Sequence, residues 1–143
     1  DPDNTVFYGF FRAGDCSLTV AASPMVEGTG RPRVEPSFIP QVIDRMIKGP
    51  DAARFAAIRF PEEIFVRRYG GSTVTDFCGT CQVMADVHRR PQAGSVVTMT
   101  CDPGDRYAAT YYNDGWLRRH GYDIAPHLDQ VRRSVRTGDW QSI

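Results

Sequence analysis

The chain has 143 residues and a mass of 16.0 kDa, the size of one domain or of part of one. Its 17 Lys and Arg residues balance its 17 Asp and Glu residues, so it lacks the net positive charge that drives binding to nucleic acid or to membrane surfaces. Hydrophobic residues make up 41% and charged residues 24%, a globular composition that excludes wholesale disorder.

The sequence shows neither a membrane span nor a targeting segment. No apolar run is long enough to cross a bilayer, and the first residues have neither the basic stretch nor the apolar core of a signal peptide. The four cysteines are too few and too scattered for a disulfide scaffold in a chain of this length. We therefore expect a reducing, cytoplasmic compartment.

The first part of the chain predicts little regular structure. Residues 5–11 form an aromatic run that fits either an edge strand or a short helix. Residues 13–37 are rich in Gly, Pro and Ser, so we expect a long irregular segment. Residues 40–46 predict a short helix with Pro40 in its first turn. A further helix begins at Asp51 and is expected to end at Phe60, because the residue before a proline avoids helical backbone.

The remaining residues predict helices on either side of one strand. The turn at residues 69–71 places Ser72 as an N-cap, and apolar residues at spacings of three and four predict a helix over about 73–89. Residues 95–101 are rich in β-branched side chains and have the length of a buried strand. Further helices are expected over 106–112, 113–120 and 126–136.

One strand cannot make a sheet, because a buried strand needs hydrogen-bonded neighbours on both sides. The order of the elements therefore predicts an α/β architecture in which this chain supplies only part of the sheet.

Three short motifs also have ordinary structural interpretations. The Gly-Gly-Ser turn at residues 70–72 suits a bound anion or polar ring atom, but a plain helix cap is the simpler interpretation of the motif by itself. Residues 27–30 lack the glycine spacing of a dinucleotide-binding loop, and a surface turn is the simpler interpretation. Cys78 and Cys81 share one helical face but lack a second pair of zinc ligands, so we expect two buried thiols and no metal site.

Six segments, in order along the chain, are similar to the C-terminal part of the fold-type II, pyridoxal-phosphate-dependent cysteine synthases, a group that also contains cystathionine β-synthase. The resemblance implies a three-layer sheet-and-helix domain like that of the tryptophan synthase β family. Residues 1–125 would form the C-terminal portion of this catalytic domain, and residues 126–143 a helical tail. The matching segments are residues 1–6, 26–30, 37–44, 70–72, 96–99 and 102–107.

The resemblance also implies roles for individual residues. In the family, the serine of the Gly-Gly-Ser turn bonds the pyridine nitrogen of pyridoxal 5′-phosphate, and the matching residue is Ser72. Cys101 and Asp102 would lie near the same side of the cofactor ring. The segment that lines the substrate side of the pocket corresponds to Gly28, Thr29 and Gly30.

The family's Schiff-base lysine has no counterpart here. Lys48 is the only lysine, and it stands at a position unrelated to the catalytic one. We assign no catalytic residue and expect the isolated chain to be inactive. The chain also departs from the family pattern at Val74 in place of a glycine, at Asp76 in place of an asparagine, and at Pro61 within an expected helix.

Functions of different classes remain open. The resemblance implies β-replacement, in which an activated serine loses its β-substituent and a sulfur nucleophile adds, carried out on an amino-acid substrate by a complete enzyme with pyridoxal phosphate. The alternative is a non-catalytic fragment that acts only by packing with a partner chain. A small thiol or zinc protein is the third alternative. A homodimer or a complementing chain is expected, because a partial sheet leaves strand edges exposed.

Overall fold

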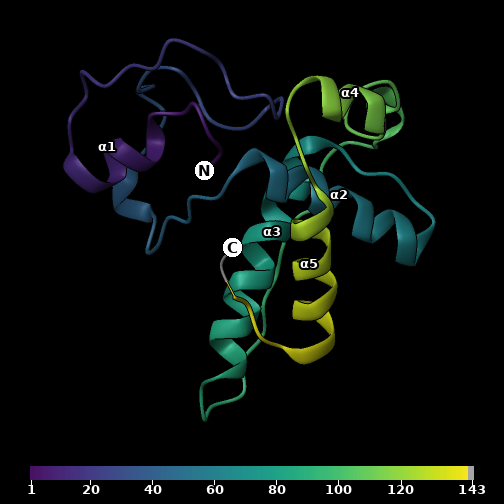
Figure 1. The fold of residues 1–143 in the computed structure, drawn as a ribbon. Helices are drawn as coiled ribbons and strands as arrows, with labels where there is room; N and C mark the ends of the chain where they lie inside the picture. Colours follow the sequence, from purple (N-terminus) through teal and green to yellow (C-terminus); the bar gives the residue numbers. More distant parts are fainter. Residues whose placement is uncertain (142–143) are drawn as a thin grey trace. The chain divides into compact units, whose positions relative to one another are not determined.

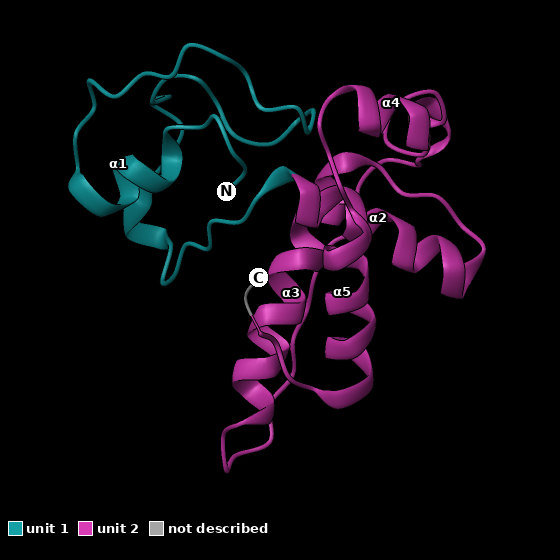
Figure 2. Cartoon of the chain, viewed as in Figure 1, with its two compact units in different colours: residues 1–51 teal, residues 52–143 magenta. Residues whose placement is uncertain are grey.

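The regular structure of the protein is helical in the computed structural model, which describes residues 1–141 (Figure 1). The chain divides into two units, residues 1–51 and residues 52–143, which are coloured separately in Figure 2. Within the described residues, β-pairing is limited to two isolated antiparallel bridges, Thr19–Arg33 and Tyr69–Pro103. None of the described helices combines the length and the hydropathy needed to span a membrane.

The first unit holds one short helix and a long irregular segment. The aromatic run forms α1, Phe7–Ala13, so the helical alternative is the one that occurs. Residues 14–37 contain no helix and no strand ladder, as their composition predicts. Phe7 stacks on Phe38 with ring centroids 4.3 Å apart, which ties the end of this segment to α1.

The helix predicted over residues 40–46 is shorter than expected. Only the 3₁₀ turn η1, Pro40–Val42, forms, and the chain is irregular from there to residue 50. The segment buries little apolar surface, since Val42 is 78% exposed and Ile43, Met46 and Ile47 are only half-buried. A short helix without tertiary packing is marginal in water, so the proline start alone does not extend it.

The predicted end of the next helix at Phe60 is wrong. α2, Asp51–Phe65, continues through Pro61, although a proline inside a helix removes one backbone hydrogen bond. Ala56, Ala57 and Ile58 are at most 1% exposed, and Pro61 is itself buried. Packing of Pro61 itself and of the residues before it therefore outweighs the local preference to stop.

Two long helices form the body of the second unit. α3, Gly71–His88, and α5, Ala125–Thr137, contact each other side by side (Figure 1). The predictions over 73–89 and 126–136 are confirmed, because α3 buries residues at spacings of three and four and α5 buries Val131 and Ser134. The buried apolar residues of α3 are Val74, Cys78, Cys81 and Ala85.

The chain between these helices forms short turns around aromatic side chains. The 3₁₀ turn η2, Asp105–Tyr107, and α4, Asp114–Arg119, replace the two longer helices expected over 106–120. Asn113 caps α4 by accepting a hydrogen bond from the Trp116 N–H. Phe55 of α2 lies 5.1 Å from Tyr111 and 4.8 Å from Tyr122 between ring centroids. Contacts between aromatic rings thus hold the turns against α2 without long helices.

Residues 95–101 do not form the predicted strand. Val97 is 92% exposed and Met99 is 71% exposed, and none of the described residues offers these positions a strand ladder. A β-rich composition favours a strand only where a neighbour supplies the backbone hydrogen bonds. The described fold is therefore mostly helical, and it does not contain the sheet of the expected α/β architecture.

Candidate functional site

The candidate site lies where the segment around residue 102 closes against the start of α3. The Gly70 N–H donates to the Asp102 carbonyl oxygen at 2.9 Å, and the Gly104 N–H donates to the Arg68 carbonyl oxygen at 3.0 Å. The Cys101 N–H donates to Thr73 Oγ1 at 2.8 Å. These bonds fix residues 101–104 beside the first turn of the helix.

Two glycines make this close approach possible. A Cβ at Gly70 would overlap Oδ1 of Asp102 and lie 2.5 Å from its Cγ. A Cβ at Gly104 would lie 2.6 Å from the backbone nitrogen of Tyr69. Both glycines have a negative φ, so what they provide here is space rather than an unusual backbone conformation.

Ser72 does not cap the helix, so the predicted N-cap is wrong. Gly70, with φ −77° and ψ 170°, takes the N-cap position, and Ser72 is the second residue of α3. The turn stays extended through Gly70 because the backbone there bonds to Asp102, which moves the helix start two residues ahead of Ser72.

The hydroxyl of Ser72 is available to a ligand. Thr73 Oγ1 accepts from the Cys101 N–H, and Thr75 Oγ1 donates to the Gly71 carbonyl oxygen at 3.2 Å. Within residues 1–141, by contrast, the Ser72 hydroxyl makes no hydrogen bond, and Ser72 is half-buried. The first-turn N–H groups of α3 point the same way along the helix axis and lack helical partners. Together these groups offer donors to an anion or to a polar ring atom.

Asp102 and Cys101 have different roles at the candidate site. Oδ2 of Asp102 accepts from the Tyr107 hydroxyl at 2.9 Å and lies 4.0 Å from Nη1 of Arg106, so the carboxylate is held by its own segment. The Cys101 side chain is exposed, with its Sγ 4.0 Å from Oδ2 of Asp76. Asp102 therefore shapes the turn, and Cys101 presents an exposed thiol near Asp76 of α3.

Tyr112 bonds to the backbone of Tyr69, next to the start of α3. It was not identified as a functional residue from the sequence. Its hydroxyl donates to the Tyr69 carbonyl oxygen at 2.9 Å and accepts from the Tyr69 N–H at 2.8 Å. The guanidinium of Arg68 lies 4.7 Å from the centre of the Tyr112 ring. Burial raises the pKa of Tyr112 to about 12, so the phenol stays neutral and keeps both bonds at neutral pH. No spacing in the sequence signals this contact, because the two tyrosines meet only through tertiary packing.

The predicted substrate residues belong to the first unit. Gly28 and Gly30 have φ values of 81° and 71°, in the left-handed region that glycine favours. The Thr29 hydroxyl donates to the Val26 carbonyl oxygen at 3.0 Å, and a Cβ at Gly30 would lie 2.7 Å from Oγ1 of Thr5. The segment is thus a pinned turn, in agreement with the simpler interpretation of its glycines.

The structure brings three of the predicted residues together. Ser72, Cys101 and Asp102 lie at one junction of the second unit through the bonds at Gly70 and Thr73. Gly28, Thr29 and Gly30 are held in the first unit.

The residues at the junction fit part of a pyridoxal phosphate site. The free Ser72 hydroxyl and the first-turn N–H groups of α3 are suitable donors to the acceptor atoms of such a group. Lys48, the one lysine of the sequence, belongs to the first unit and is exposed. The second unit contains no lysine, so it offers donors to such a group but no amine for a covalent link.

Cys78 and Cys81 are packed thiols in the body of α3. Both side chains are buried, and burial raises the pKa of each thiol, that of Cys81 to about 12. Among the described residues, no group of three or more His, Cys, Asp or Glu side chains could hold a metal ion. The thiols therefore stay protonated and serve as small core side chains.

Comparison with known proteins found one match relevant to these residues. No family model matches the chain. Over 139 residues the chain is 44% identical to a curated protein described as L-cysteine desulfhydrase Cds1 of Mycobacterium tuberculosis (strain ATCC 25177 / H37Ra). The match covers 95% of this chain and 38% of that protein, so the chain spans well under half the length of this relative. Similarity to part of a cysteine desulfhydrase agrees with the expectation of part of a cysteine-metabolising enzyme.

Proposed function

We propose that this chain is a C-terminal segment of a pyridoxal-phosphate-dependent enzyme that acts on L-cysteine. The observation that carries the proposal is the 44% identity to a cysteine desulfhydrase, which extends over 95% of the chain. The proposed reaction of the complete enzyme is cleavage of the Cβ–S bond of cysteine, with release of sulfide. Water completes the reaction, and the remaining carbons and nitrogen leave as pyruvate and ammonia.

The relative favours elimination over replacement. β-Replacement and desulfhydration share their first half, in which the substituent on the β-carbon of the amino acid departs. They differ in whether a sulfur nucleophile then adds. The name of the relative describes loss of sulfur from cysteine, so we propose elimination in place of the addition that the family resemblance alone implies.

In this proposal the cofactor stabilises the negative charge that develops on the α-carbon of the amino acid. Ser72 donates a hydrogen bond to the ring nitrogen from the first turn of α3. A neutral hydroxyl does not hold that nitrogen protonated, which suits elimination and replacement at the β-carbon. Cys101 and Asp102 form the wall beside the ring, and Asp102 keeps the wall in place through its bond from Tyr107.

Gly28, Thr29 and Gly30 are proposed to line the substrate side of the pocket. The left-handed φ of both glycines and the absence of their side chains allow backbone N–H groups to approach a substrate closely. The hydroxyl of Thr29 already bonds to the Val26 carbonyl oxygen, so the turn is pre-formed.

The complete domain is proposed to have the α/β architecture of the fold-type II family. In it, residues 95–101 pair with strands that the remaining polypeptide supplies. The exposure of Val97 and Met99 supports this, since a strand buried between neighbours would cover both side chains. Residues 1–125 then belong to the catalytic domain and residues 126–143 to a tail, of which the structure describes residues 126–141 and in which Val131 of α5 packs in the core of the second unit.

A chimera tests the proposal. In the mycobacterial desulfhydrase, the 139 matching residues are replaced by this chain, and sulfide release from L-cysteine is measured with added pyridoxal phosphate. We expect the chimera to release sulfide and the isolated chain to release none. A chimera that folds, as judged by circular dichroism, but releases no sulfide would contradict the proposed activity and favour a non-catalytic packing role.

A further inference from the structure

A pocket lies between the second half of α3 and the end of α5, and none of its residues belongs to the junction around Ser72. It has a volume of about 320 Å³ and is lined by residues of the second unit. The segment after α3 closes one side, since a Cβ at Gly94 would lie 3.1 Å from Cγ1 of Val87. The turn after α5 closes another, since a Cβ at Gly138 would lie 3.0 Å from the ring of His88. The pocket is therefore framed by packed backbone on two sides.

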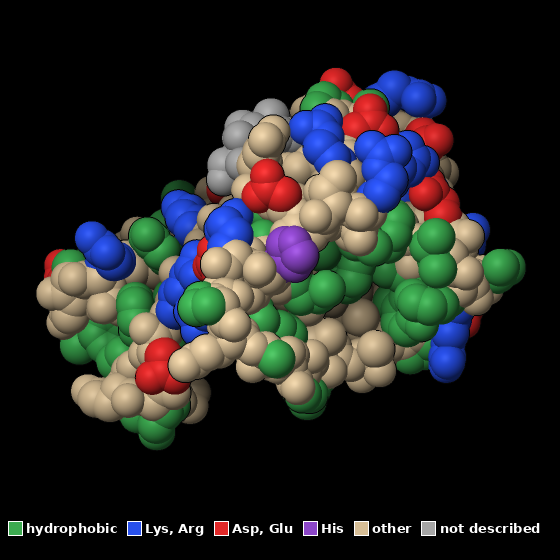
Figure 3. All heavy atoms as spheres, turned by 90° about the horizontal axis from the view of Figure 1, so that it is seen from below, with side chains coloured by type: hydrophobic (Ala, Val, Ile, Leu, Met, Phe, Trp, Pro, Cys, Tyr) green, Lys and Arg blue, Asp and Glu red, His purple; other side chains and the backbone are tan. Residues whose placement is uncertain are grey.

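The walls of this pocket are mostly apolar. Met84 and Val135 are 48% and 47% exposed, so they stand at its mouth. Hydrophobic side chains gather on the face seen from below in Figure 3, the end of the second unit at which α3 finishes in Figure 1. The described lining contains no Asp, Glu, Lys or Arg. A charged ligand would lose its water there without gaining an opposite charge, so the pocket favours a neutral one. The apolar side chains of the lining are Met84, Ala85, Val87, Val96 and Val135.

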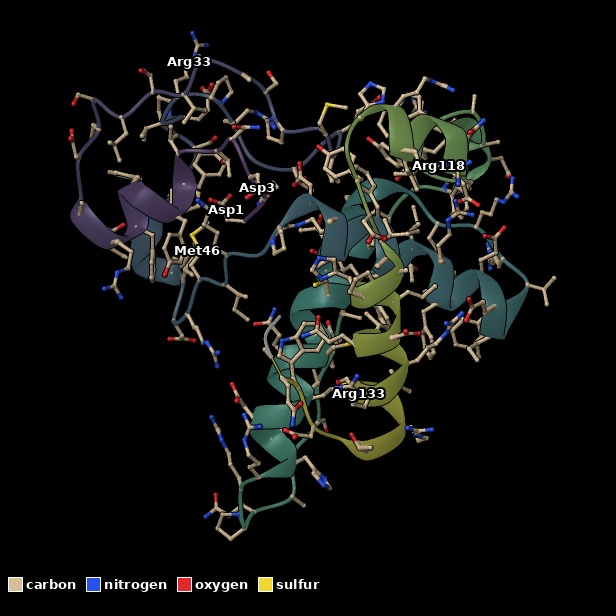
Figure 4. All side chains as sticks on the ribbon, in the orientation of Figure 1. Asp1, Asp3, Arg33, Met46, Arg118 and Arg133 are labelled. Carbon is tan, nitrogen blue, oxygen red and sulfur yellow. The ribbon has the colours of Figure 1, made fainter. Side chains whose placement is uncertain are left out.

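A buried serine hydroxyl in the lining has no partner. Ser134 follows Arg133, which is labelled on α5 in Figure 4. It is 5% exposed, and within residues 1–141 its hydroxyl makes no hydrogen bond. Thr75, Thr80 and Thr137 behave differently, because each hydroxyl donates to the carbonyl oxygen four residues earlier in its helix. Buried polar groups in folded proteins are nearly always paired, so the Ser134 hydroxyl indicates a ligand that brings the missing partner.

The facing helix brings a second neutral polar group to the same pocket. Cys81 of α3 lines it and is 2% exposed, and its thiol makes no hydrogen bond among the described residues. Burial raises the pKa of Cys81 to about 12, so the thiol stays protonated and is a weak donor. His88, the last residue of α3, is exposed at the rim. Each of the two helices thus presents one unpaired donor to a pocket with apolar walls.

We propose that this pocket is a second binding site, which takes a small neutral molecule with an apolar body and one carbonyl or hydroxyl oxygen. The apolar body packs against Met84, Val96 and Val135. The oxygen accepts a hydrogen bond from the Ser134 hydroxyl, with the Cys81 thiol as the weaker donor. Ligand pockets usually have apolar walls, a few polar groups and volumes of about 300–1,000 Å³. The pocket lies at the lower end of that range, so its ligand is small.

Another part of the complete polypeptide is the rival occupant, because the chain covers 38% of its mycobacterial relative. A packed apolar side chain would cover Met84 and Val135. It would leave the Ser134 hydroxyl without a partner, whereas a ligand oxygen supplies one. The unpaired hydroxyl therefore favours the small molecule, and a measurement on the chimera with the desulfhydrase separates the two occupants.

The test uses cyclohexanone, a neutral ring with one carbonyl oxygen, and cyclohexanecarboxylate, a similar ring with a charge. Each is titrated into the isotope-labelled 143-residue chain, and the amide signals are followed by NMR. Ser134→Ala removes the proposed donor. Thr80→Ala is the matched control, because its hydroxyl bonds within α3 and lies outside the lining. Circular dichroism checks the fold of each variant. Saturation-transfer NMR then measures cyclohexanone binding to the chimera.

We expect cyclohexanone to shift the amide signals of the pocket lining in the wild-type chain and in Thr80→Ala alike. Ser134→Ala should bind it about three- to tenfold more weakly, as loss of one hydrogen bond predicts. The carboxylate should bind more weakly than the ketone, and the chimera should bind the ketone too. If Ser134→Ala does not fold, the wild-type shifts and the comparison of the two probes still decide the question.

Four results would overturn the proposal in the wild-type chain and its variants: no shifts at millimolar cyclohexanone, shifts outside the lining, tighter binding of the carboxylate, or equal binding by folded Ser134→Ala. A chimera that does not bind the ketone would assign the pocket to the remaining polypeptide and would overturn it as well. These measurements need neither pyridoxal phosphate nor cysteine, so their failure is distinct from failure of the proposed enzymatic function.

Discussion

The side chain of Asp102 fills the space in front of Gly70, while the Gly70 N–H donates to the Asp102 carbonyl oxygen at 2.9 Å. The two residues are far apart in the sequence, and their contact decides where α3 begins. It also places Ser72 in the first turn of the helix with its hydroxyl free. The geometry of the candidate site therefore depends on the absence of a side chain at residue 70.

Gly70→Ala should destabilise the second unit by about 1–3 kcal/mol, the usual range for an overpacked contact. The added methyl overlaps the Asp102 carboxylate, which must turn away and lose its bond from Tyr107. Urea unfolding followed by circular dichroism measures the change. Adding Asp102→Ala to Gly70→Ala should recover part of the loss by restoring space. Gly79→Ala is the matched control, since a Cβ there meets nothing within 4 Å. Equal stability of Gly70→Ala and wild type would contradict the packing described.

Tyr112→Phe should lower the free energy of unfolding by about 1–3 kcal/mol, because the N–H and C=O of Tyr69 both lose their partner. Tyr8→Phe serves as the control, since the Tyr8 hydroxyl makes no hydrogen bond within residues 1–141. Chemical unfolding of both variants at neutral pH measures the free energy of unfolding that each substitution removes. A loss no larger than that of the control would count against the double contact.

Tyr112 also predicts how stability responds to alkaline pH. Its pKa in the folded protein, about 12, lies above the value of about 10 in an unfolded chain. The neutral phenol therefore stabilises the fold fully below pH 10, and this contribution disappears as the pH rises from about 10 to about 12. Wild-type stability should fall more steeply than that of Tyr112→Phe over this range. Parallel pH profiles of the two proteins would contradict the assignment.

The four thiols should react in two classes. Cys16 and Cys101 are exposed, whereas Cys78 and Cys81 are buried and their burial raises the pKa of both. With limiting iodoacetamide near pH 8, mass spectrometry should find the first pair alkylated well before the second. Addition of urea should abolish the difference. Rapid alkylation of Cys78 or Cys81 in the folded chain would instead indicate reactive thiols and revive the thiol-protein alternative.

Val66→Gly should make the second unit more stable. Glycine relieves the left-handed backbone at residue 66, so unfolding of the chain, measured at low concentration, should become harder by up to about 1 kcal/mol. Val97→Gly has no left-handed strain to relieve and should give no gain. A destabilised Val66→Gly variant would contradict the strain inferred there.

Periodic burial was the part of the fold that could be predicted from the sequence. The apolar residues of α3 recur at helical spacing, and the structure buries Val74, Cys78 and Cys81 as that spacing requires. The same holds for Val131 in α5. In both helices the apolar residues that recur at helical spacing are also residues that the tertiary fold buries. The sequence pattern therefore predicts the buried face of each helix.

Elements whose outcome depends on distant residues were mispredicted. Pro61 stays inside α2 because it and residues before it, such as Ala57 and Ile58, are buried, and no local sequence rule predicts that packing. Residues 95–100 lack a strand because no ladder partner is present among the described residues. Ser72 loses the N-cap to Gly70 because of the contact with Asp102.

For the site, the motifs identified Ser72, Cys101 and Asp102, which the structure brings together at one junction. They did not identify Tyr112, since its contact with Tyr69 joins segments with no shared pattern. Sequence spacing predicts which residues share a face of one helix. Contacts between different elements can be identified only from the three-dimensional structure.

The cofactor affinity of the chimera with the mycobacterial desulfhydrase tests the central claim most directly. Pyridoxal phosphate is titrated into the chimera and into its Ser72→Ala variant, and the visible absorbance of the bound cofactor is recorded. Ser95→Ala is the matched control, because Ser95 is exposed and lies outside the junction. We expect the chimera and the control to bind the cofactor alike, and Ser72→Ala to bind it at least about tenfold more weakly, as loss of one buried hydrogen bond to the ring predicts. A folded chimera that binds no cofactor, or equal binding by Ser72→Ala and Ser95→Ala, would contradict the account.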